Sequence, residues 1–397
     1  MSNNNKRNIP IAKTLFDEKD IANIIKPLES GWVVQGPFVK QFEDRFSDFT
    51  KAPHSIAVTS CSAALHMALA ALGIKPGDEV IVPAFTWIAT ANAAEHLGAK
   101  AVFCDINLET YNIDISQIEE KITSHTKAII PVHLFGLPAE MGDIITISKK
   151  HNLHIVEDAA CGFGAYYNNR HVGNFGDIGC FSFHPRKAIT TGEGGMLTTS
   201  DEKTAGLLRT LRNHGATTSD FARHNSKGAF LLSEYNYRGY NYRMTDIQGA
   251  LGVSQLEKAQ WILDQRTSKA KYYDKLLADV DYLKTPKCPD HMIHGYQSYV
   301  CLFQPEPISF AKLPKLNKIR NDLLIALEEV GISTRQGTHA VTLQNYYRDK
   351  YKIKNEDYRN ACFADQLTIT LPLYPQITEE EQQYVVENIK MEFENKL

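Results

Sequence analysis

Between residues 55 and 200 the chain alternates short apolar runs with helical stretches, and this alternation restricts the fold more than any other feature. The apolar runs are SIAVTS near 55, EVIVP near 79, AVFCD near 101, KAIIPVH near 127, HIVED near 154 and IGCFSF near 178. Each has the length of a buried strand, and helix-like material separates most of them. Strands joined by such connections lie parallel. The pattern predicts an α/β fold with a mostly parallel sheet covered by helices.

A second, smaller domain is expected after this sheet. The chain has 397 residues, which exceeds the size at which a single hydrophobic core stops growing. The segment MTDIQGALGVSQLEKAQWILDQRT predicts a long helix that leads out of the first domain. We place the boundary near residue 255, with a large domain over 1–255 and a small α+β domain over 256–397. The small domain is expected to hold a strand at SYVCLF, a helix at KIRNDLLIALEEVG and a last helix with a capping box of Thr378 and Glu381.

Charge and cysteine content exclude several classes of protein. Lysines and arginines number 43 against 46 acidic residues, and the net charge of −3 offers no basic face for nucleic acid or an anionic membrane. The seven cysteines are scattered and form no C-x-x-C pair, which favours a reducing compartment without structural zinc. The N-terminus lacks the apolar region of a secretion signal, and no apolar run is long enough to span a bilayer. We therefore expect a cytoplasmic protein that binds small molecules and no metal ion.

A carboxylate followed by a lysine predicts the chemistry. Lys187 lies in CFSFHPRKAITTGEGGM, downstream of Asp158 in IVEDAACGFGA. Taken singly, such a lysine is usually a solvated cation and such an acid a helix cap. Together they suit pyridoxal phosphate, because a lysine amine forms an imine with an aldehyde and a buried carboxylate keeps the ring nitrogen protonated. Side chains alternate along a strand, so we expect Asp158 and not Glu157 to face the cofactor.

The segment TSCSAALHMALAALG predicts a phosphate site. A strand ends at Ser60, Cys61 and Ser62 and runs directly into a helix, so hydroxyls and free backbone amides meet there. The plainer alternative is that Ser62 only caps the helix. Ser182, at the end of the IGCFSF run, would add another hydroxyl to the same phosphate.

One aromatic side chain is a candidate for stacking on the cofactor. PAFTWIATANA places Phe85 and Trp87 just after the EVIVP run. A flat ring there could lie on one face of a heteroaromatic cofactor, and we choose Trp87 for that role. The alternative is a core aromatic that packs beneath a helix.

The motifs TSCSAALH, PAFTW, PVHLFG, VEDAACGFGA, VGNFGDIGCFSFHPRK, TTGEGGM and GYNYRMTDIQGALGVSQLE, in this order, closely resemble the DegT-type nucleotide-sugar aminotransferases. The resemblance covers nearly the whole chain. It implies a three-layer large domain of the aspartate aminotransferase type I fold, pyridoxal 5′-phosphate, and a homodimer whose active sites are shared across the interface. The implied reaction is amino transfer to a keto-sugar carried on a nucleoside diphosphate.

The resemblance also implies roles for individual residues that hold the cofactor. Lys187 matches the lysine that binds the cofactor covalently, and Asp158 matches the partner of its ring nitrogen. Trp87 matches the stacking aromatic. The phosphate ligands correspond to Cys61 with Ser62 in the phosphate loop, and to Ser182.

Two further positions concern the other subunit and a departure from the family pattern. Asn241, in GYNYRM, corresponds to a residue that reaches the cofactor phosphate from the partner subunit, so a monomer would hold an incomplete site. Cys161 stands where many relatives have glutamine. This replacement leaves open the hydrogen bond that glutamine offers to the phenolic oxygen of the cofactor.

The resemblance favours transamination, with glutamate as the amino donor. Some members carry histidine in place of the lysine and dehydrate C3 of a keto-sugar, whereas this chain keeps Lys187. We expect an NDP-linked 4-keto-6-deoxyhexose, aminated at C4, for a surface polysaccharide such as the O-antigen of lipopolysaccharide. The alternatives are a 3-keto-sugar aminotransferase, dehydratase or lyase chemistry, and a non-catalytic regulatory protein. Candidate substrate contacts are His184, Arg335 and His339, for which surface or packing roles are equally open.

Overall fold

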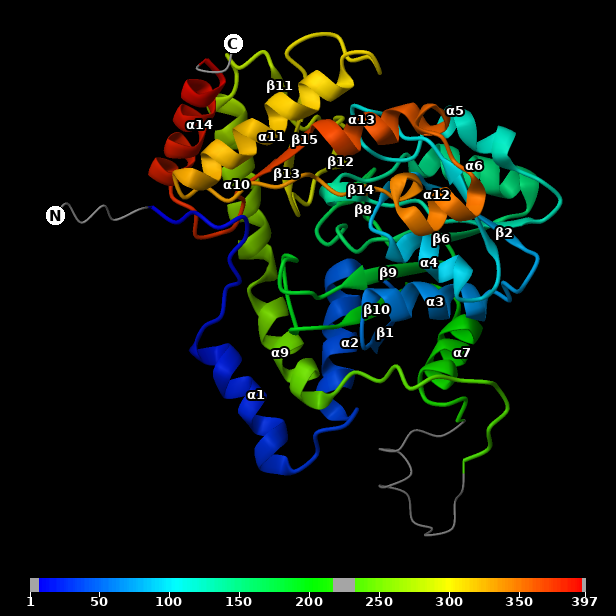
Figure 1. Cartoon of the computed structure of the whole chain (residues 1–397). Coiled ribbons are helices and arrows are strands. Elements are labelled where there is room, and N and C mark those ends of the chain that lie inside the picture. The colour runs from blue at the N-terminus through cyan, green and yellow to red at the C-terminus, as the bar shows by residue number, and fades with distance from the viewer. Residues whose placement is uncertain (1–6, 217–232, 395–397) are drawn as a thin grey trace.

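The computed structural model describes residues 7–216 and 233–394, and its centre is a seven-stranded sheet in the order β1-β10-β9-β6-β5-β2-β4 (Figure 1). β10 runs antiparallel to β1 and β9, and the other neighbours pair in parallel. Each apolar run identified in the sequence forms one of these strands, so the predicted mostly parallel sheet is confirmed. The strands are β1 (His54–Val58), β2 (Glu79–Pro83), β4 (Lys100–Cys104), β5 (Thr126–Ile129), β6 (His154–Asp158), β9 (Ile178–Ser182) and β10 (Gly195–Thr199).

Helices cover both faces of the sheet, because successive side chains of its buried strands point to opposite faces. Val80 and Val82 of β2 belong to the core beneath α3 and α4, whereas Ile81 belongs to the core beneath α6. This arrangement produces three layers. The first face carries α3 (Cys61–Ala71), α4 (Ala89–Glu95) and α7 (Glu202–Arg212), and the second carries α5 (Ile115–Ile118) and α6 (Met141–His151).

A helical rod formed by α9 (Asp246–Glu257) and α10 (Ala259–Leu276) runs from α1 (Glu18–Ser30) to the C-terminal helices (Figure 1). We predicted one continuous helix, and this prediction is wrong at Lys258, whose φ of −107° and ψ of 6° are not helical. Its ammonium lies 2.6 Å from Asp17 Oδ2 and 2.5 Å from Asp20 Oδ2. Since the Asp20 carboxylate is buried, this cluster ties α1 to the junction between the two helices.

The C-terminal part contains a small antiparallel sheet with helices beside it. The sheet has the order β11-β13-β15, formed by β11 (Leu283–Lys284), β13 (Tyr299–Phe303) and β15 (Thr368–Leu371). The predicted strand and helices are present as β13, α11 (Leu313–Glu329) and α14 (Glu379–Glu394). The predicted capping box is confirmed, since the Glu381 amide donates to Thr378 Oγ1 at 3.1 Å and the Thr378 amide to Glu381 Oε2 at 2.8 Å. One hydrophobic core runs through both parts of the chain, and the domain boundary near residue 255 stays a prediction.

Short elements complete the fold. β3 (Phe85–Thr86) pairs with β14 (His339–Ala340), which brings the C-terminal part against the large sheet. In the described parts of the chain, no helix has the length and apolar character needed to cross a membrane. The other elements are α2 (Pro37–Thr50), β7 (Tyr166–Tyr167), β8 (Arg170–His171), β12 (Met292–Ile293), α12 (Asn345–Tyr351), α13 (Arg359–Leu367), and the 3₁₀ turns η1 (Glu119–Lys121), η2 (Leu134–Gly136), η3 (Val341–Leu343) and η4 (Asn355–Tyr358).

Candidate active site

The candidate site lies where the carboxyl ends of β6 and β9 meet the first turns of α3 and α4. Asp158 is the last residue of β6, and Lys187 lies in the loop that follows β9. Parallel sheets collect ligands at this edge, because the strands end there and the loops that follow carry polar side chains. The topology therefore brings the two predicted reactive residues to the same edge of the sheet.

Asp158 is buried, with an exposed fraction of 4%, and its carboxylate accepts two hydrogen bonds from the residues that the structure describes. The Thr90 hydroxyl donates to Oδ2 at 2.7 Å, and the Ala160 amide donates to Oδ1 at 3.1 Å. Burial raises the pKa of this carboxyl above its ordinary value, although the two hydrogen bonds and the charge of Lys187 oppose the increase. A buried acid with such a pKa is well placed to share a proton with a ring nitrogen.

Glu157 points to the opposite side of β6 and serves the fold. Its Oε1 accepts from the Gly176 amide at 2.7 Å, and its Oε2 accepts from the Gly173 amide at 2.7 Å. The Ala139 amide donates to His133 Nδ1, so the proton of the neutral imidazole lies on Nε2, which is 3.0 Å from Glu157 Oε2. Burial opposes ionisation of Glu157, but these donors prevail and hold its pKa below the ordinary value. The different directions of Glu157 and Asp158 are those expected from strand alternation.

The Lys187 amine is half-buried and lies 3.2 Å from Cys161 Sγ. The Lys187 backbone amide donates to the His184 carbonyl at 2.8 Å, which closes a tight turn around the lysine. The positive charge of Lys187 acts on the pKa of Asp158, so the amine and the carboxylate are close enough to interact. The structure thus brings the lysine and the acid together, with the thiol beside the amine.

The first turn of α3 offers free backbone donors. Among the described residues, none accepts a hydrogen bond from the amides of Cys61 and Ser62, as expected at a helix N-terminus. The residue that caps the helix is Ser60, whose Oγ accepts from the Ala63 amide at 3.1 Å, so the alternative that named Ser62 as the cap is wrong. Ser62 is exposed, and Ser60 still has a hydroxyl proton to donate. A Cβ atom on Gly195 would come within 2.7 Å of the Cys61 nitrogen, so only glycine lets β10 approach this turn.

Trp87 and His339 lie side by side next to the β3–β14 pair. The ring of Trp87 is 55% exposed, and its centroid is 6.0 Å from that of His339. The exposure of Trp87 makes its ring available to a ligand, whereas Phe85 is fully buried in the core. Arg335 is exposed beside β15, where its backbone pairs with that of Thr370.

The other predicted residues lie at separate positions around this edge. Ser182 pairs with Gly195 at the end of β9, next to the first turn of α3. His184 is partly buried, and this burial together with the cations Arg186 and Lys187 lowers its pKa. Asn241 is exposed and pairs through its backbone with Asn213. Within this single chain, the structure does not bring the Asn241 side chain to Lys187 or Asp158.

The sequence interpretation missed two buried threonines beside Asp158. Thr90 donates to Asp158, and Thr86 Oγ1 lies 3.0 Å from Thr90 Oγ1. Both lie in PAFTWIATANA, four residues apart around the start of α4, and this spacing was the available signal. Threonines in such a segment usually only pack or cap, so the spacing alone does not distinguish these two.

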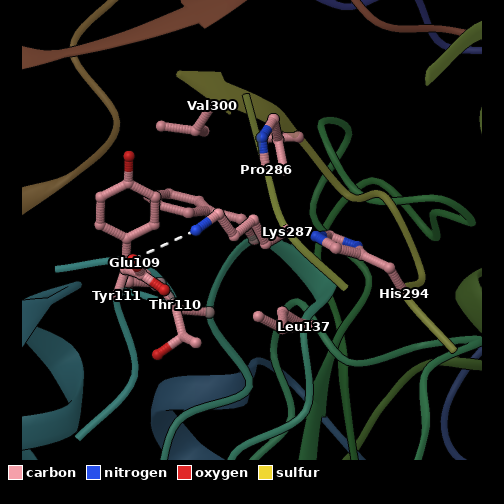
Figure 2. Close-up of a pocket in the computed structure, with 11 residues that line it drawn as sticks. Glu109, Thr110, Tyr111, Leu137, Pro286, Lys287, His294 and Val300 are labelled. Carbon is pink, nitrogen blue, oxygen red and sulfur yellow. Dashed lines mark hydrogen bonds and ion pairs between the residues drawn. The ribbon is translucent and has the colours of Figure 1, made fainter. Parts of the chain in front are cut away.

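Two hollows in the described structure lie away from these residues. Figure 2 shows the first, a crevice where Lys287 lies 3.1 Å from Glu109, close to Tyr111, His294 and Val300. Its volume of about 10 Å³ holds a single water molecule at most. The second, of about 390 Å³, lies beside Lys51 and Arg170. No predicted site residue lines either hollow, and among the described residues no group of three or more His, Cys, Asp or Glu side chains could hold a metal ion.

A family model described as the DegT/DnrJ/EryC1/StrS aminotransferase family matches residues 15–390. The chain belongs to this family. It is 37% identical over 388 residues to the spore coat polysaccharide biosynthesis protein SpsC of Bacillus subtilis, and the match covers 97% of each chain. This DegT-family chain is therefore a pyridoxal phosphate-dependent sugar aminotransferase.

Solved structures of aminotransferases share its fold. The putative sugar aminotransferase Spr1654 of Streptococcus pneumoniae superimposes in its PMP-form with a TM-score of 0.91, at 28% identity, over 98% of this chain and 100% of the other. PseC of Helicobacter pylori, an aminotransferase involved in the biosynthesis of pseudoaminic acid, superimposes with a TM-score of 0.88, at 26% identity, over 98% and 100%. Spr1654 has also been solved in a PLP-form. The predicted type I aminotransferase fold and the cofactor are thus confirmed.

The residues of this chain fit pyridoxal phosphate in three respects. The Lys187 amine can bind an aldehyde, the buried Asp158 carboxylate can hold a ring nitrogen, and the free amides of Cys61 and Ser62 can donate to a phosphate at a helix N-terminus. A coenzyme of this kind presents an aldehyde, a basic ring nitrogen and a phosphate, and the site has a group suited to each.

Proposed function

We propose that this enzyme transfers the amino group of glutamate to C4 of a 4-keto-6-deoxyhexose linked to a nucleoside diphosphate, in the synthesis of a surface polysaccharide. The observation that carries the proposal is the joint placement of the Lys187 amine, the Asp158 carboxylate and the free amides of α3 at one edge of the sheet. SpsC, named for spore coat polysaccharide, and PseC, which acts in pseudoaminic acid synthesis, support the sugar and the glycan.

Each residue has a distinct task in this proposal. Bound pyridoxal phosphate supplies an electron-accepting ring and an aldehyde carbon that carries the amino group between substrates. Asp158 holds a proton at the ring nitrogen, and Trp87 keeps the ring in place by stacking. The phosphate is bound by two backbone amides and three hydroxyls. The amides are those of Cys61 and Ser62, and the hydroxyls are those of Ser60, Ser62 and Ser182. Lys187 Nζ takes a proton from the amino-bearing carbon of the donor and returns one to the sugar carbon.

The substrate is proposed to enter beside Trp87. His339 lies next to the Trp87 ring, and His184 lies one turn from Lys187. Arg335 presents an exposed guanidinium, which suits the diphosphate of a nucleotide sugar because a guanidinium can bind phosphate oxygens in pairs. The seven free cysteines support the prediction that the enzyme works in a reducing, cytoplasmic setting.

A homodimer with shared active sites is part of the proposal. The side chains of Ile21, Ile25 and Leu28 on α1 are 42–57% exposed, as is Phe16 just before the helix at 53%. Apolar side chains gathered on one helix indicate a surface that a partner covers. Asn241 is also exposed, so it is free to reach the cofactor phosphate of a second copy.

Complementation between two inactive variants tests the shared site. Lys187→Ala removes the lysine and Asn241→Ala removes the contact from the neighbouring subunit, so each pure variant should be impaired. A mixed dimer holds one site with both residues intact, and part of the activity should return after the variants are unfolded and refolded together. Mixtures that stay as impaired as the separate variants would contradict the shared site.

A panel of keto-sugar nucleotides tests the reaction itself. The enzyme, with glutamate and NDP-linked 4-keto- and 3-keto-6-deoxyhexoses, should convert the 4-keto sugar to an aminosugar and form 2-oxoglutarate. Mass spectrometry of the product establishes amination, and NMR establishes the carbon that carries the nitrogen. Amination at C3 would favour the alternative position, and loss of a hydroxyl or release of ammonia would replace transamination by dehydratase or lyase chemistry.

A further inference from the structure

Three buried side chains form a chain of hydrogen bonds that ends at Asp158. Thr86 Oγ1 lies 3.0 Å from Thr90 Oγ1, and Thr90 Oγ1 lies 2.7 Å from Asp158 Oδ2. Thr86, Thr90 and Asp158 have exposed fractions of 1%, 0% and 4%. Thr86 comes from β3 and Thr90 from α4, whereas Asp158 ends β6, so three elements that are separate in the sequence meet here.

The direction of these hydrogen bonds follows from the number of protons. An ionised carboxylate can only accept, so Thr90 must give its single hydroxyl proton to Asp158. Thr90 then has only lone pairs to offer Thr86, and Thr86 must be the donor between the two hydroxyls. The proton order Thr86 to Thr90 to Asp158 is therefore set by the charge on Asp158, and it favours the charged form.

We propose that Thr90 is a positioning residue that keeps Asp158 ionised and fixes the direction of its carboxylate, and that Thr86 holds Thr90 in this donating state. The proposal rests on the role proposed above for Asp158 as the partner of the ring nitrogen. It adds two buried residues that act through the acid.

Thr90 is important because the Asp158 carboxylate has few direct hydrogen-bond donors among the described residues. The carboxylate of Asp158 accepts from the Ala160 amide and the Thr90 hydroxyl, and the charge of Lys187 acts on it without a direct bond. The Ala160 bond uses Oδ1 and the Thr90 bond uses Oδ2, so together they fix the plane of the carboxylate. Losing the Thr90 donor removes one of these two constraints and makes the acid more basic.

The relay, meaning the hydrogen bonds from Thr86 through Thr90 to Asp158, is also connected to a candidate substrate contact. The backbone of Thr86 pairs with His339 across the β3–β14 ladder, and His339 lies beside Trp87. The strand that carries a candidate substrate contact is thus joined through two hydroxyls to the acid beneath the cofactor. Thr86 is held by backbone pairing, which gives its hydroxyl a fixed position from which to donate.

The experiment compares Thr90→Val, which keeps the branched shape and removes the hydroxyl, with Thr90→Ser, which keeps the hydroxyl. In the holoenzyme, Thr90→Val should lower kcat by about tenfold to a hundredfold, the range for loss of one hydrogen bond to a charged group, with a smaller change in KM for the donor. Because the acid becomes more basic, the acidic limb of the kcat profile and the pH-dependent visible absorbance of the bound cofactor should move to higher pH. Thr90→Ser should restore both.

Thr86→Val completes a double-mutant cycle. It should have a smaller effect than Thr90→Val and no further effect in the Thr90→Val background, because Thr86 acts only through Thr90. Thr50→Val is a matched control, since Thr50 is equally buried but donates to the Phe46 carbonyl of its own helix. If Thr90→Val does not fold, Thr90→Ala carries the same comparison with Thr90→Ser.

Equal behaviour of the valine and serine variants, or additive effects of the two threonines, would overturn the relay. So would a lower melting temperature with an unchanged absorbance and pH profile, which would show that Thr90 only packs. Asp158→Asn distinguishes failure of the relay from failure of the role proposed for Asp158. If this change alters the cofactor spectrum while Thr90→Val does not, the relay fails and the role of Asp158 stands, and if Asp158→Asn changes nothing, the proposed function of the acid fails.

Discussion

Lys187→Ala is expected to lower turnover by at least about a thousandfold while the fold is kept. The loss combines covalent attachment of the cofactor with proton transfer, and positioned proton transfer alone contributes about 10²- to 10⁴-fold. The side chain is half-buried and bonds only to Cys161 Sγ among the described residues, so its removal should change the free energy of unfolding little. The measurements are kcat with glutamate and keto-sugar, and thermal unfolding of both proteins.

Borohydride reduction provides a second readout for the same variant. The wild-type protein should retain cofactor on the peptide that contains Lys187 after reduction and digestion, whereas the variant should retain none. Lys203→Ala, at an exposed position of α7, is the matched control and should behave as wild type. Turnover near the wild-type rate in Lys187→Ala, or trapping of the cofactor at another lysine, would refute the assignment.

Asp158→Asn is expected to reduce kcat by about a hundredfold to a thousandfold and to spare the stability of the cofactor-free protein. The catalytic loss follows because a neutral amide cannot stabilise a positive charge on the ring nitrogen. Removing one such electrostatic contact from a reacting centre has effects of about this size. The amide oxygen can still accept from Thr90, so packing is retained. Cofactor absorbance and kcat report the first effect, and denaturant unfolding of the apoprotein reports the second.

The raised pKa of Asp158 predicts whether this variant is more or less stable than the wild type. Burial raises the pKa of Asp158 above the ordinary value of 3.8, so the folded protein binds this proton more tightly than the unfolded chain. The contribution of Asp158 to stability is therefore complete at acidic pH, below 3.8, and is lost as pH rises through the folded pKa. Asp158→Asn removes this decline, so the apoprotein variant at neutral pH should be at least as stable as the wild type. A clear loss of stability would show that the charge serves the fold.

Glu157→Gln is the matched control from the neighbouring position and should show the reverse pattern. Burial opposes its ionisation, yet His133 and the backbone amides hold its pKa below the ordinary value, so the charge stabilises the protein above that value and the benefit is lost in acid. Removing it should lower the free energy of unfolding by about 3 kcal/mol, because each hydrogen bond to a charged group contributes about 1.5 to 3 kcal/mol and several to this carboxylate are weakened together. Activity per folded molecule should change much less than in Asp158→Asn.

Much of this architecture could be predicted because its signals are local. Runs such as EVIVP and HIVED have the length and apolar character of buried strands, and they became β2 and β6. The same locality made the last helix predictable, since Thr378 and Glu381 are three residues apart and cap it by direct contact. The break at Lys258 escaped prediction because it involves Asp17 and Asp20, which are far away in the sequence.

The sequence by itself determined the parallel sheet and the motifs that hold Lys187 and Asp158, because short-range patterns of polarity decide which segments become strands and which residues follow them. Only the tertiary structure decided what surrounds the acid, because Thr90 and Asp158 are 68 residues apart and their hydrogen bond depends on how α4 packs against β6. It also decided that Cys161 lies against the lysine amine, 26 residues away in the sequence. These contacts depend on how elements that are distant in the sequence pack together, which a linear pattern does not contain.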